Sequence, residues 1–250
     1  MNLARQASEI QVSEAERKKK SQNRSAKINY NAVMEKLIAG LEGKKASLLL
    51  HACCGPCSTA CLEKISLFFE ISVYFYNPNI YPFEEYEKRR DEIFKFVEKL
   101  NFATGREIRI LEGGYDKDDY DRAIRIEECP ELAFEAERGE RCRRCYEFRM
   151  KKAFEYAAEN NFDFFATTLT LSPYKDSDKV NEIGRLLDEQ AVKNGLELRY
   201  LYSDFKKKNG YLRSIEISKE YGVYRQDYCG CVYSLSSNAA GIVAERPQRL

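Results

Sequence analysis

Short apolar runs alternate with longer amphipathic stretches along most of this 250-residue chain. Apolar runs of this length are typical of buried strands, and apolar residues spaced three or four positions apart are typical of helices that cover a sheet. The predicted strands are residues 46–50, 71–76, 107–111, 162–167 and 196–202. The predicted helices are residues 28–41, 58–69, 83–100, 115–128, 139–160, 176–194 and 214–221. This alternation predicts the α/β class with a doubly wound parallel sheet.

The pattern divides the chain into three parts. Residues 1–45 are charged and predicted to be a helical N-terminal extension, with a basic run from Arg17 to Lys20. That run is either a solvated helix face or a basic arm that contacts nucleic-acid phosphates. Residues 46–235 are the predicted α/β domain, which we expect to be catalytic, and residues 236–250 are a C-terminal tail.

No apolar run reaches the roughly 18–20 residues that cross a bilayer, and the N-terminus has no apolar signal-peptide region. We therefore expect a cytoplasmic protein with no membrane partner. The chain carries 41 Lys and Arg against 40 Asp and Glu. Because these charges nearly cancel, contact with a nucleic acid would require a local basic patch.

Nine cysteines are many for a cytosolic chain, in which structural disulfides are rare. Two of them, Cys61 and Cys129, are expected to be simple buried thiols. The other seven are clustered, which indicates metal or redox chemistry. They are Cys53, Cys54, Cys57, Cys142, Cys145, Cys229 and Cys231.

The first cysteine cluster, within residues 51–57, follows the first predicted strand and precedes a predicted helix. Ligands of parallel sheets bind beyond the carboxyl ends of the strands, and the positive end of a helix favours a thiolate. Cys53 and Cys54 are adjacent, and a disulfide between neighbours would strain the peptide that joins them. A metal is the expected partner.

The second cluster, Cys142-Arg-Arg-Cys145, opens a predicted helix. Together with Cys53 and Cys54 it offers four thiolates, enough for a tetrahedral zinc or a 4Fe-4S cluster. In a 4Fe-4S cluster each thiolate binds a different iron, so the cluster accommodates adjacent cysteines better than one zinc ion does. The pattern favours iron-sulfur and leaves zinc as the alternative.

The third cluster, Cys229-Gly-Cys231, has a different spacing. A disulfide across one residue is strained, and strained disulfides are easily reduced. This pair suits a redox relay, with metal binding as the alternative.

Several polar residues are candidate substrate contacts. Thr168, Ser172 and Lys175 form a hydroxyl-rich turn after a strand, which either caps the chain locally or binds a phosphate. His51, the only histidine, is either a satisfied strand-end residue or a group that orients the metal or moves a proton. Basic residues near Cys142 and at positions 206–208 form either a local RNA patch or solvated helix faces.

Four motifs, in this order, closely resemble the QueH family of epoxyqueuosine reductases over roughly residues 45–235. They are His51-Ala-Cys-Cys-Gly-Pro-Cys57, Arg141-Cys-Arg-Arg-Cys-Tyr146, residues 167–175 (TTLTLSPYK), and Tyr224-Arg-Gln-Asp-Tyr-Cys-Gly-Cys231. The resemblance implies reduction of epoxyqueuosine to queuosine at the tRNA wobble position, the last step of queuosine biosynthesis. Its partners would be tRNA carrying epoxyqueuosine and an unidentified electron donor.

The resemblance also implies roles for individual residues. The 4Fe-4S ligands would be Cys53, Cys54, Cys142 and Cys145, and the redox-active disulfide would join Cys229 and Cys231. Apart from the resemblance, Cys57 lies close to Cys53 and Cys54 in the sequence and is a candidate ligand of an additional mononuclear iron, and Arg225 is a candidate substrate contact. Family members have an adenine nucleotide alpha hydrolase-like (HUP) fold, but cysteines replace the glycine-rich ATP loop here, so use of ATP is not expected. The alternatives are a cluster-dependent tRNA thiolase and a non-catalytic, zinc-stabilised RNA-binding module.

Overall fold

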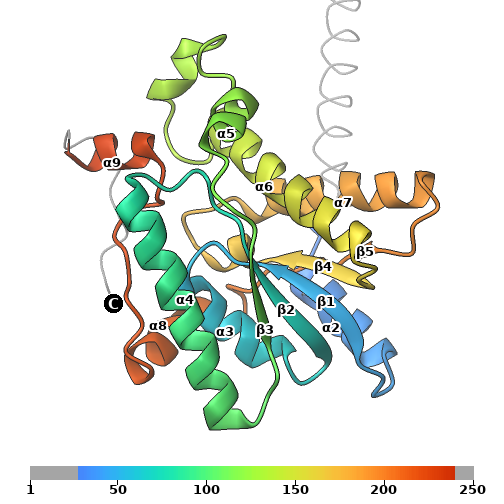
Figure 1. Cartoon of the computed structure of the whole chain (residues 1–250). Coiled ribbons are helices and arrows are strands. Elements are labelled where there is room, and N and C mark those ends of the chain that lie inside the picture. The colour runs from blue at the N-terminus through green and yellow to red at the C-terminus, as the bar shows by residue number, and fades with distance from the viewer. Residues whose placement is uncertain (1–27, 240–250) are drawn as a thin grey trace, which may run out of the picture.

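The computed structural model describes residues 28–239, with side chains as far as residue 235. A five-stranded sheet crosses the molecule between two layers of helices (Figure 1). Every strand pair is parallel, and the spatial order is β3-β2-β1-β4-β5. The strands are β1 (Ala46–His51), β2 (Phe69–Phe75), β3 (Arg109–Glu112), β4 (Phe164–Thr167) and β5 (Arg199–Tyr200). The predicted α/β class with a doubly wound parallel sheet is confirmed, while the relation to the HUP fold stays a prediction.

The helices cover both faces of the sheet (Figure 1). They are α2 (Tyr30–Gly40), α3 (Gly55–Ile65), α4 (Phe83–Thr104), α5 (Lys117–Ile124), α6 (Glu140–Glu159), α7 (Ser177–Lys193), α8 (Gly210–Glu220) and α9 (Val232–Ala239). Short 3-10 turns occupy Pro130–Phe134 and Thr168–Leu171. Leu48 and Leu50 of β1 pack with residues of α2, α3, α4 and α8, whereas Leu49 packs with α6 and α7. Side chains alternate between the two faces of a strand, so β1 contributes to both cores.

The strand order fixes where a ligand can approach. From β1 the chain moves outward through β2 to β3 and then returns to the other side of β1 as β4 and β5. The connections therefore diverge between β1 and β4, and the crevice beyond the carboxyl ends of these strands is the usual ligand site of such sheets. In this parallel pair His51 stands opposite Thr167, so the segments that follow both strands meet at this crevice.

Some predicted boundaries were wrong for identifiable reasons. Helix α3 begins at Gly55, directly after the paired cysteines, because Pro56 suits the first turn of a helix. It ends at Ile65, and Phe69 already belongs to β2. Helix α9 was not predicted, because it is short and rich in serine, and it crosses the expected start of the C-terminal tail at residue 236.

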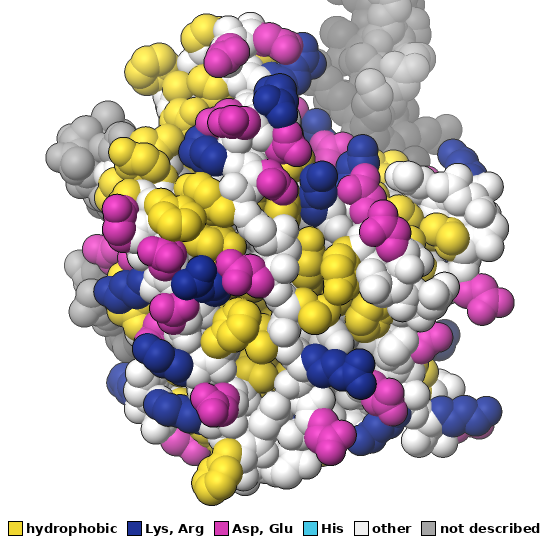
Figure 2. Space-filling model, in the orientation of Figure 1, with side chains coloured by type: hydrophobic (Ala, Val, Ile, Leu, Met, Phe, Trp, Pro, Cys, Tyr) yellow, Lys and Arg dark blue, Asp and Glu magenta, His cyan; other side chains and the backbone are white. Residues whose placement is uncertain are grey.

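Most of the predicted N-terminal extension, residues 1–27, lies outside the described residues, as does most of the tail, residues 240–250. Within residues 28–239, no helix is long and apolar enough to cross a membrane. On the face drawn in Figure 2, basic and acidic side chains are interspersed, as the near-zero net charge suggests.

Candidate metal centre and redox pair

Three thiols meet at the start of α3. The sulfurs of Cys53, Cys54 and Cys57 all lie within 4.8 Å of one another, and those of Cys53 and Cys54 are 3.8 Å apart. Cys53 and Cys54 are buried and Cys57 is half-buried. Thiolates that are close together and shielded from water are the donors that zinc and iron-sulfur clusters use. This trio is therefore a candidate metal site.

Thr168, at the end of β4, holds Cys53 from the opposite side of the crevice. Its Oγ1 accepts a hydrogen bond from the Cys53 backbone N–H at 3.1 Å, and its hydroxyl donates to the Cys53 sulfur at 3.5 Å. The predicted contact of Thr168 with the substrate stays a prediction, while Thr168 is fully buried and supports a candidate metal ligand. This role follows from the pairing of β1 with β4.

Charge is shared unequally within the trio. Hydrogen bonds from the Cys54 and Cys57 thiols hold the pKa of Cys53 well below its usual value, although burial opposes this shift. The interaction with Cys53 in turn raises the pKa of Cys54 to about 11 and that of Cys57 well above its usual value. The first negative charge therefore forms on Cys53.

The second cluster occupies the first turns of α6. Cys142 and Cys145 are buried, and burial raises the pKa of Cys142 to about 11. Cys142 belongs to the same apolar cluster as Cys53 and Cys54, and Cys145 packs beside Tyr120 of α5. Neither residue belongs to the closely spaced trio. Cys142 therefore lies in the same buried cluster as the Cys53/Cys54 pair. The four predicted ligand sulfurs do not, however, form one closely spaced group within residues 28–239.

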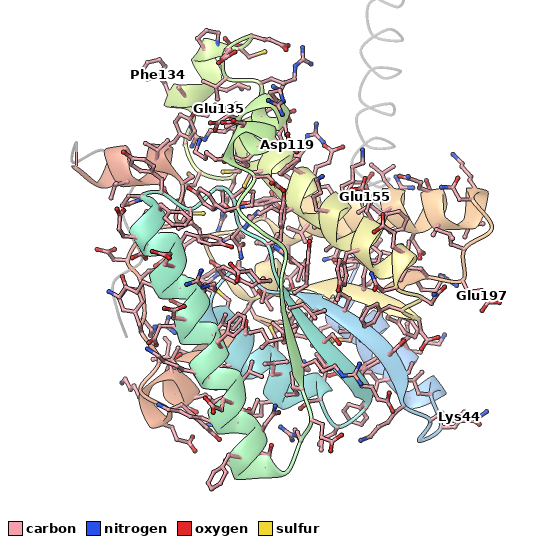
Figure 3. All side chains as sticks on the ribbon, in the orientation of Figure 1. Lys44, Asp119, Phe134, Glu135, Glu155 and Glu197 are labelled. Atoms are coloured by element: carbon pink, nitrogen blue, oxygen red, sulfur yellow. The ribbon has the colours of Figure 1, made fainter. Side chains whose placement is uncertain are left out.

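The arginines around Cys142 do not form an open basic patch. Arg141 is buried and donates from Nη1 to the carbonyl oxygens of Leu132 and Ala133 at 2.7 and 3.0 Å. Its backbone N–H donates to the carboxylate of Glu135, which directly follows the 3-10 turn Pro130–Phe134 and is labelled in Figure 3. Arg143 and Arg144 both pair with Glu140. Arg143 and Arg144 are therefore ion-paired on the helix and Arg141 is buried, while a local RNA patch formed with other basic residues stays a prediction.

The Cys-Gly-Cys segment lies just before α9. Cys229 is half-buried and Cys231 is buried, with its sulfur 3.5 Å from the Ser234 hydroxyl. The hydrogen bond from the Cys231 thiol holds the pKa of Cys229 well below its usual value, despite burial. The charges of Lys175 and Arg149 act in the same direction. Cys229 is therefore the sulfur of this pair that ionises first.

Two cations connect the three cysteine segments. Burial opposes the charge of Arg149, yet Cys145, Cys229 and Cys53 hold the pKa of its guanidinium above the usual value. Burial likewise opposes the charge of Lys175, but Cys229, Cys53 and Cys57 raise the pKa of its ammonium. Each cation thus interacts with thiols that are far apart in the sequence. The α3 and Cys-Gly-Cys segments converge on both cations, and the α6 cysteine Cys145 interacts with both as well.

The remaining predicted contacts have local partners. His51 is fully buried, and its Nδ1 and Nε2 lie 2.9 Å from Thr167 Oγ1 and 3.1 Å from the Tyr76 carbonyl oxygen. Since a carbonyl only accepts, Nε2 carries the proton, and burial lowers the pKa of His51 to about 3. The ring is therefore neutral, and both of its nitrogens have hydrogen-bond partners on neighbouring strand ends.

Ser172 and Arg225 also engage neighbours. The Ser172 hydroxyl accepts from the Tyr174 N–H at 3.2 Å, which is a local turn contact. Arg225 is exposed and donates to Ser218 of α8 at 3.4 Å. Cys61 is fully buried as expected, and its thiol donates to the Cys57 carbonyl, whereas Cys129 is only half-buried.

Sequence reasoning missed two arginines that matter here, Arg89 and Arg149. Both are almost fully buried, although each lies in a charged, amphipathic helix where a basic residue usually faces solvent. Arg149 donates to Asn77 and to the Cys145 carbonyl, while its Nη2 has no hydrogen-bond partner among residues 28–239. Only their position beside the cysteine segments distinguishes them from ordinary surface arginines.

Fold and site together define a cysteine-rich α/β protein with a candidate metal centre at the point where its sheet connections diverge. The family model described as "Epoxyqueuosine reductase QueH" matches residues 48–237. A protein of that name from Streptococcus pyogenes serotype M1 is 42% identical, over 88% of this chain and 84% of its own length. A protein with the same description from Staphylococcus aureus strain Mu50 is 39% identical, over 86% of this chain and 87% of its own length. Another, from Thermotoga maritima, is 32% identical, over 76% of this chain and 90% of its own length. The chain belongs to the QueH family of epoxyqueuosine reductases and is an oxidoreductase.

Proposed function

We propose that this chain reduces epoxyqueuosine to queuosine in tRNA, with an iron-sulfur cluster and the Cys229/Cys231 pair as its redox groups. Membership of the reductase family supports the substrate. The redox assignment is carried by the buried cluster that Cys53, Cys54 and Cys142 share and by the electrostatic interaction of thiols from all three cysteine segments with Arg149 and Lys175. A purely structural zinc site would not require a further thiol pair beside buried cations.

The residues present suit a 4Fe-4S cluster in their chemistry. Cys53, Cys54, Cys142 and Cys145 would hold it, and all four are buried thiols. Several thiolates in a shielded site need compensating positive charge, and Arg89, Arg149 and Lys175 supply it. Cys57, in contact with the Cys53/Cys54 pair, is available to an additional iron. When bound, such a cluster exchanges electrons one at a time.

The side chains supply the rest of the chemistry. Converting an epoxide to an alkene and water takes two electrons and two protons. The dithiol of Cys229 and Cys231 holds that number and releases them when the two sulfurs join as a disulfide. Lys175, whose ammonium interacts with Cys229, Cys53 and Cys57, holds a proton and a positive charge beside these thiols. In this proposal its charge stabilises the negative charge that develops on the departing oxygen.

An external donor must then return two electrons to the pair. Cys229 is the more exposed of the two residues, and we propose that a donor reaches it first. We propose a cytoplasmic reductant for this step, in keeping with the location expected from the sequence.

The test is anaerobic purification followed by iron and acid-labile sulfide analysis and an assay on tRNA carrying epoxyqueuosine, read by mass spectrometry of the nucleosides. Stoichiometric cluster and formation of queuosine are expected. A colourless zinc protein without activity would support the RNA-binding alternative. If the double variant Cys229→Ser/Cys231→Ser keeps full single-turnover activity after pre-reduction, the pair serves only to recharge the enzyme.

A further inference from the structure

Arg89 is the buried cation that directly contacts the Cys-Gly-Cys segment. It lies in the first half of α4 within the charged run Glu87-Lys-Arg-Arg-Asp91, yet its side chain is only 2% exposed. Its Nε donates to Glu85 at 2.7 Å, one turn earlier on the same helix. This bond uses Nε and leaves both terminal nitrogens available to another segment.

Those two nitrogens bind the backbone that carries the redox pair. Nη1 donates to the Cys229 carbonyl at 3.1 Å, and Nη2 lies 3.5 Å from the Tyr228 carbonyl. The guanidinium also stacks 4.8 Å from the centre of the Tyr228 ring. A planar guanidinium can fix two consecutive carbonyls in one geometry, which a single ammonium cannot do.

Gly230 fits closely against the same guanidinium. Its φ of +117° lies in a region that residues with a side chain rarely adopt, and an added Cβ would lie 2.8 Å from Arg89 Nη1 and 3.1 Å from Ile80. The Gly230 carbonyl accepts from the Tyr81 N–H at 2.8 Å. The glycine between the two cysteines is therefore held on both sides by residues near the start of α4.

We propose that Arg89 is a positioning residue for the Cys229/Cys231 pair, which fixes the backbone between the two sulfurs and favours the dithiol over the disulfide. The inference rests on the proposed redox role of this pair. Oxidation joins the two sulfurs and releases two electrons and two protons. A thiolate on Cys229 exists only in the reduced form, so a nearby fixed cation stabilises that form and makes the pair more oxidising.

The electrostatics agree with this geometry. The Cys231 thiol contributes most to the lowered pKa of Cys229, and Arg89 adds to it together with Lys175 and Arg149. Arg89 also acts on Cys54, at the start of α3. One side chain thus contacts the redox segment and influences the candidate metal site.

The experiment compares Arg89→Met and Arg89→Lys with a control, Arg90→Met. Arg90 is the next residue on α4, but it is more exposed and pairs with Asp91 and Glu112. Anaerobically purified full-length protein is equilibrated with glutathione buffers, free thiols are alkylated, and the peptide containing Cys229 and Cys231 is quantified by mass spectrometry. Glutathione disulfide accepts the two electrons and two protons and becomes two glutathione molecules.

We expect Arg89→Met to shift this equilibrium at least tenfold toward the disulfide, which is about 30 mV for a two-electron couple. Arg89→Lys keeps the charge but loses the two-carbonyl contact, so a smaller shift of about threefold is expected. Arg90→Met should match wild type. Circular dichroism and thermal melting establish that each variant is folded, since a merely structural arginine would change the melting temperature without moving the equilibrium.

If Arg89→Met folds and has the same thiol–disulfide equilibrium as wild type, the positioning role of Arg89 is refuted. The proposed redox role of the cysteine pair is not affected by that result. If that variant does not fold, a wild-type equilibrium in Arg89→Lys refutes the positioning role instead. If the wild-type protein forms no Cys229–Cys231 disulfide at any glutathione ratio, the proposed redox role of the pair fails, and the inference fails with it.

Discussion

Replacing Thr168 with valine tests how β4 supports the metal site. Valine has nearly the same shape as threonine but lacks the hydroxyl. The change therefore removes the acceptor of the Cys53 N–H, at 3.1 Å, and the donor to the Cys53 sulfur, at 3.5 Å. Because Cys53 and Thr168 are both buried, water does not readily replace the lost partner.

The expected cost follows from these contacts. A buried donor left without a partner costs about 1–3 kcal/mol. In a protein of this size each kcal/mol lowers the melting temperature by about 2–4 °C, so a loss of about 2 kcal/mol lowers it by roughly 4–8 °C. Thr168→Ser is the matched control, because it keeps the hydroxyl and loses only one methyl group, worth about 0.8 kcal/mol.

Urea unfolding of the metal-free protein measures this difference, and iron retention after gel filtration measures its effect on the site. We expect Thr168→Val to be about 1–2 kcal/mol less stable than Thr168→Ser and to retain less iron. Equal stability and equal iron in the two variants would refute the reasoning, because the hydroxyl would then contribute nothing to holding Cys53.

Three further outcomes follow from the site and its surroundings. Because the pKa of His51 is lowered to about 3 in the folded state, unfolded protein binds a proton below pH 6.5 that folded protein does not, so stability falls as the pH falls. Between pH 6.5 and 5 the free energy of unfolding of the metal-free wild type should fall by about 2 kcal/mol more than that of His51→Gln. Urea unfolding of both proteins at each pH measures this difference, and its absence would contradict a buried, neutral His51. Cys53→Ser should lose most of the iron and sulfide, whereas Cys61→Ser, altered at a buried thiol outside the trio, should keep them; equal contents would exclude Cys53 as a ligand. In Gly184→Ala the new Cβ would lie 2.1 Å from the buried Tyr200 ring, so thermal melting should show a loss of about 1–3 kcal/mol, and an unchanged melting curve would show that the ring can move aside.

Much of the architecture could be predicted because its signals are local. The periodicity of strands and helices depends on residues that are close in sequence. It predicted all five strands and most helices to within a few residues of their observed ends. The rule that ligands bind beyond the carboxyl ends of parallel strands then placed residues 51–57 at the ligand site. The β1–β4 pairing in the structure adds the turn after β4 to the same crevice. The thiol chemistry was equally visible, because the spacing of cysteines is itself a local pattern.

The supports of the site could not be predicted in this way. Arg89 meets the Cys229 carbonyl across 140 positions of sequence, and Thr168 meets Cys53 across 115. A charged side chain on an amphipathic helix can face either water or a buried segment, depending on which distant segment packs against the helix. The periodicity of the helix does not show which segment that is. The sequence alone therefore determined the α/β elements, the cysteine motifs and the place of residues 51–57 at a strand end. Only the tertiary structure decided that Cys57 joins the first pair, that Thr168 holds a ligand, and that buried arginines lie against the thiols.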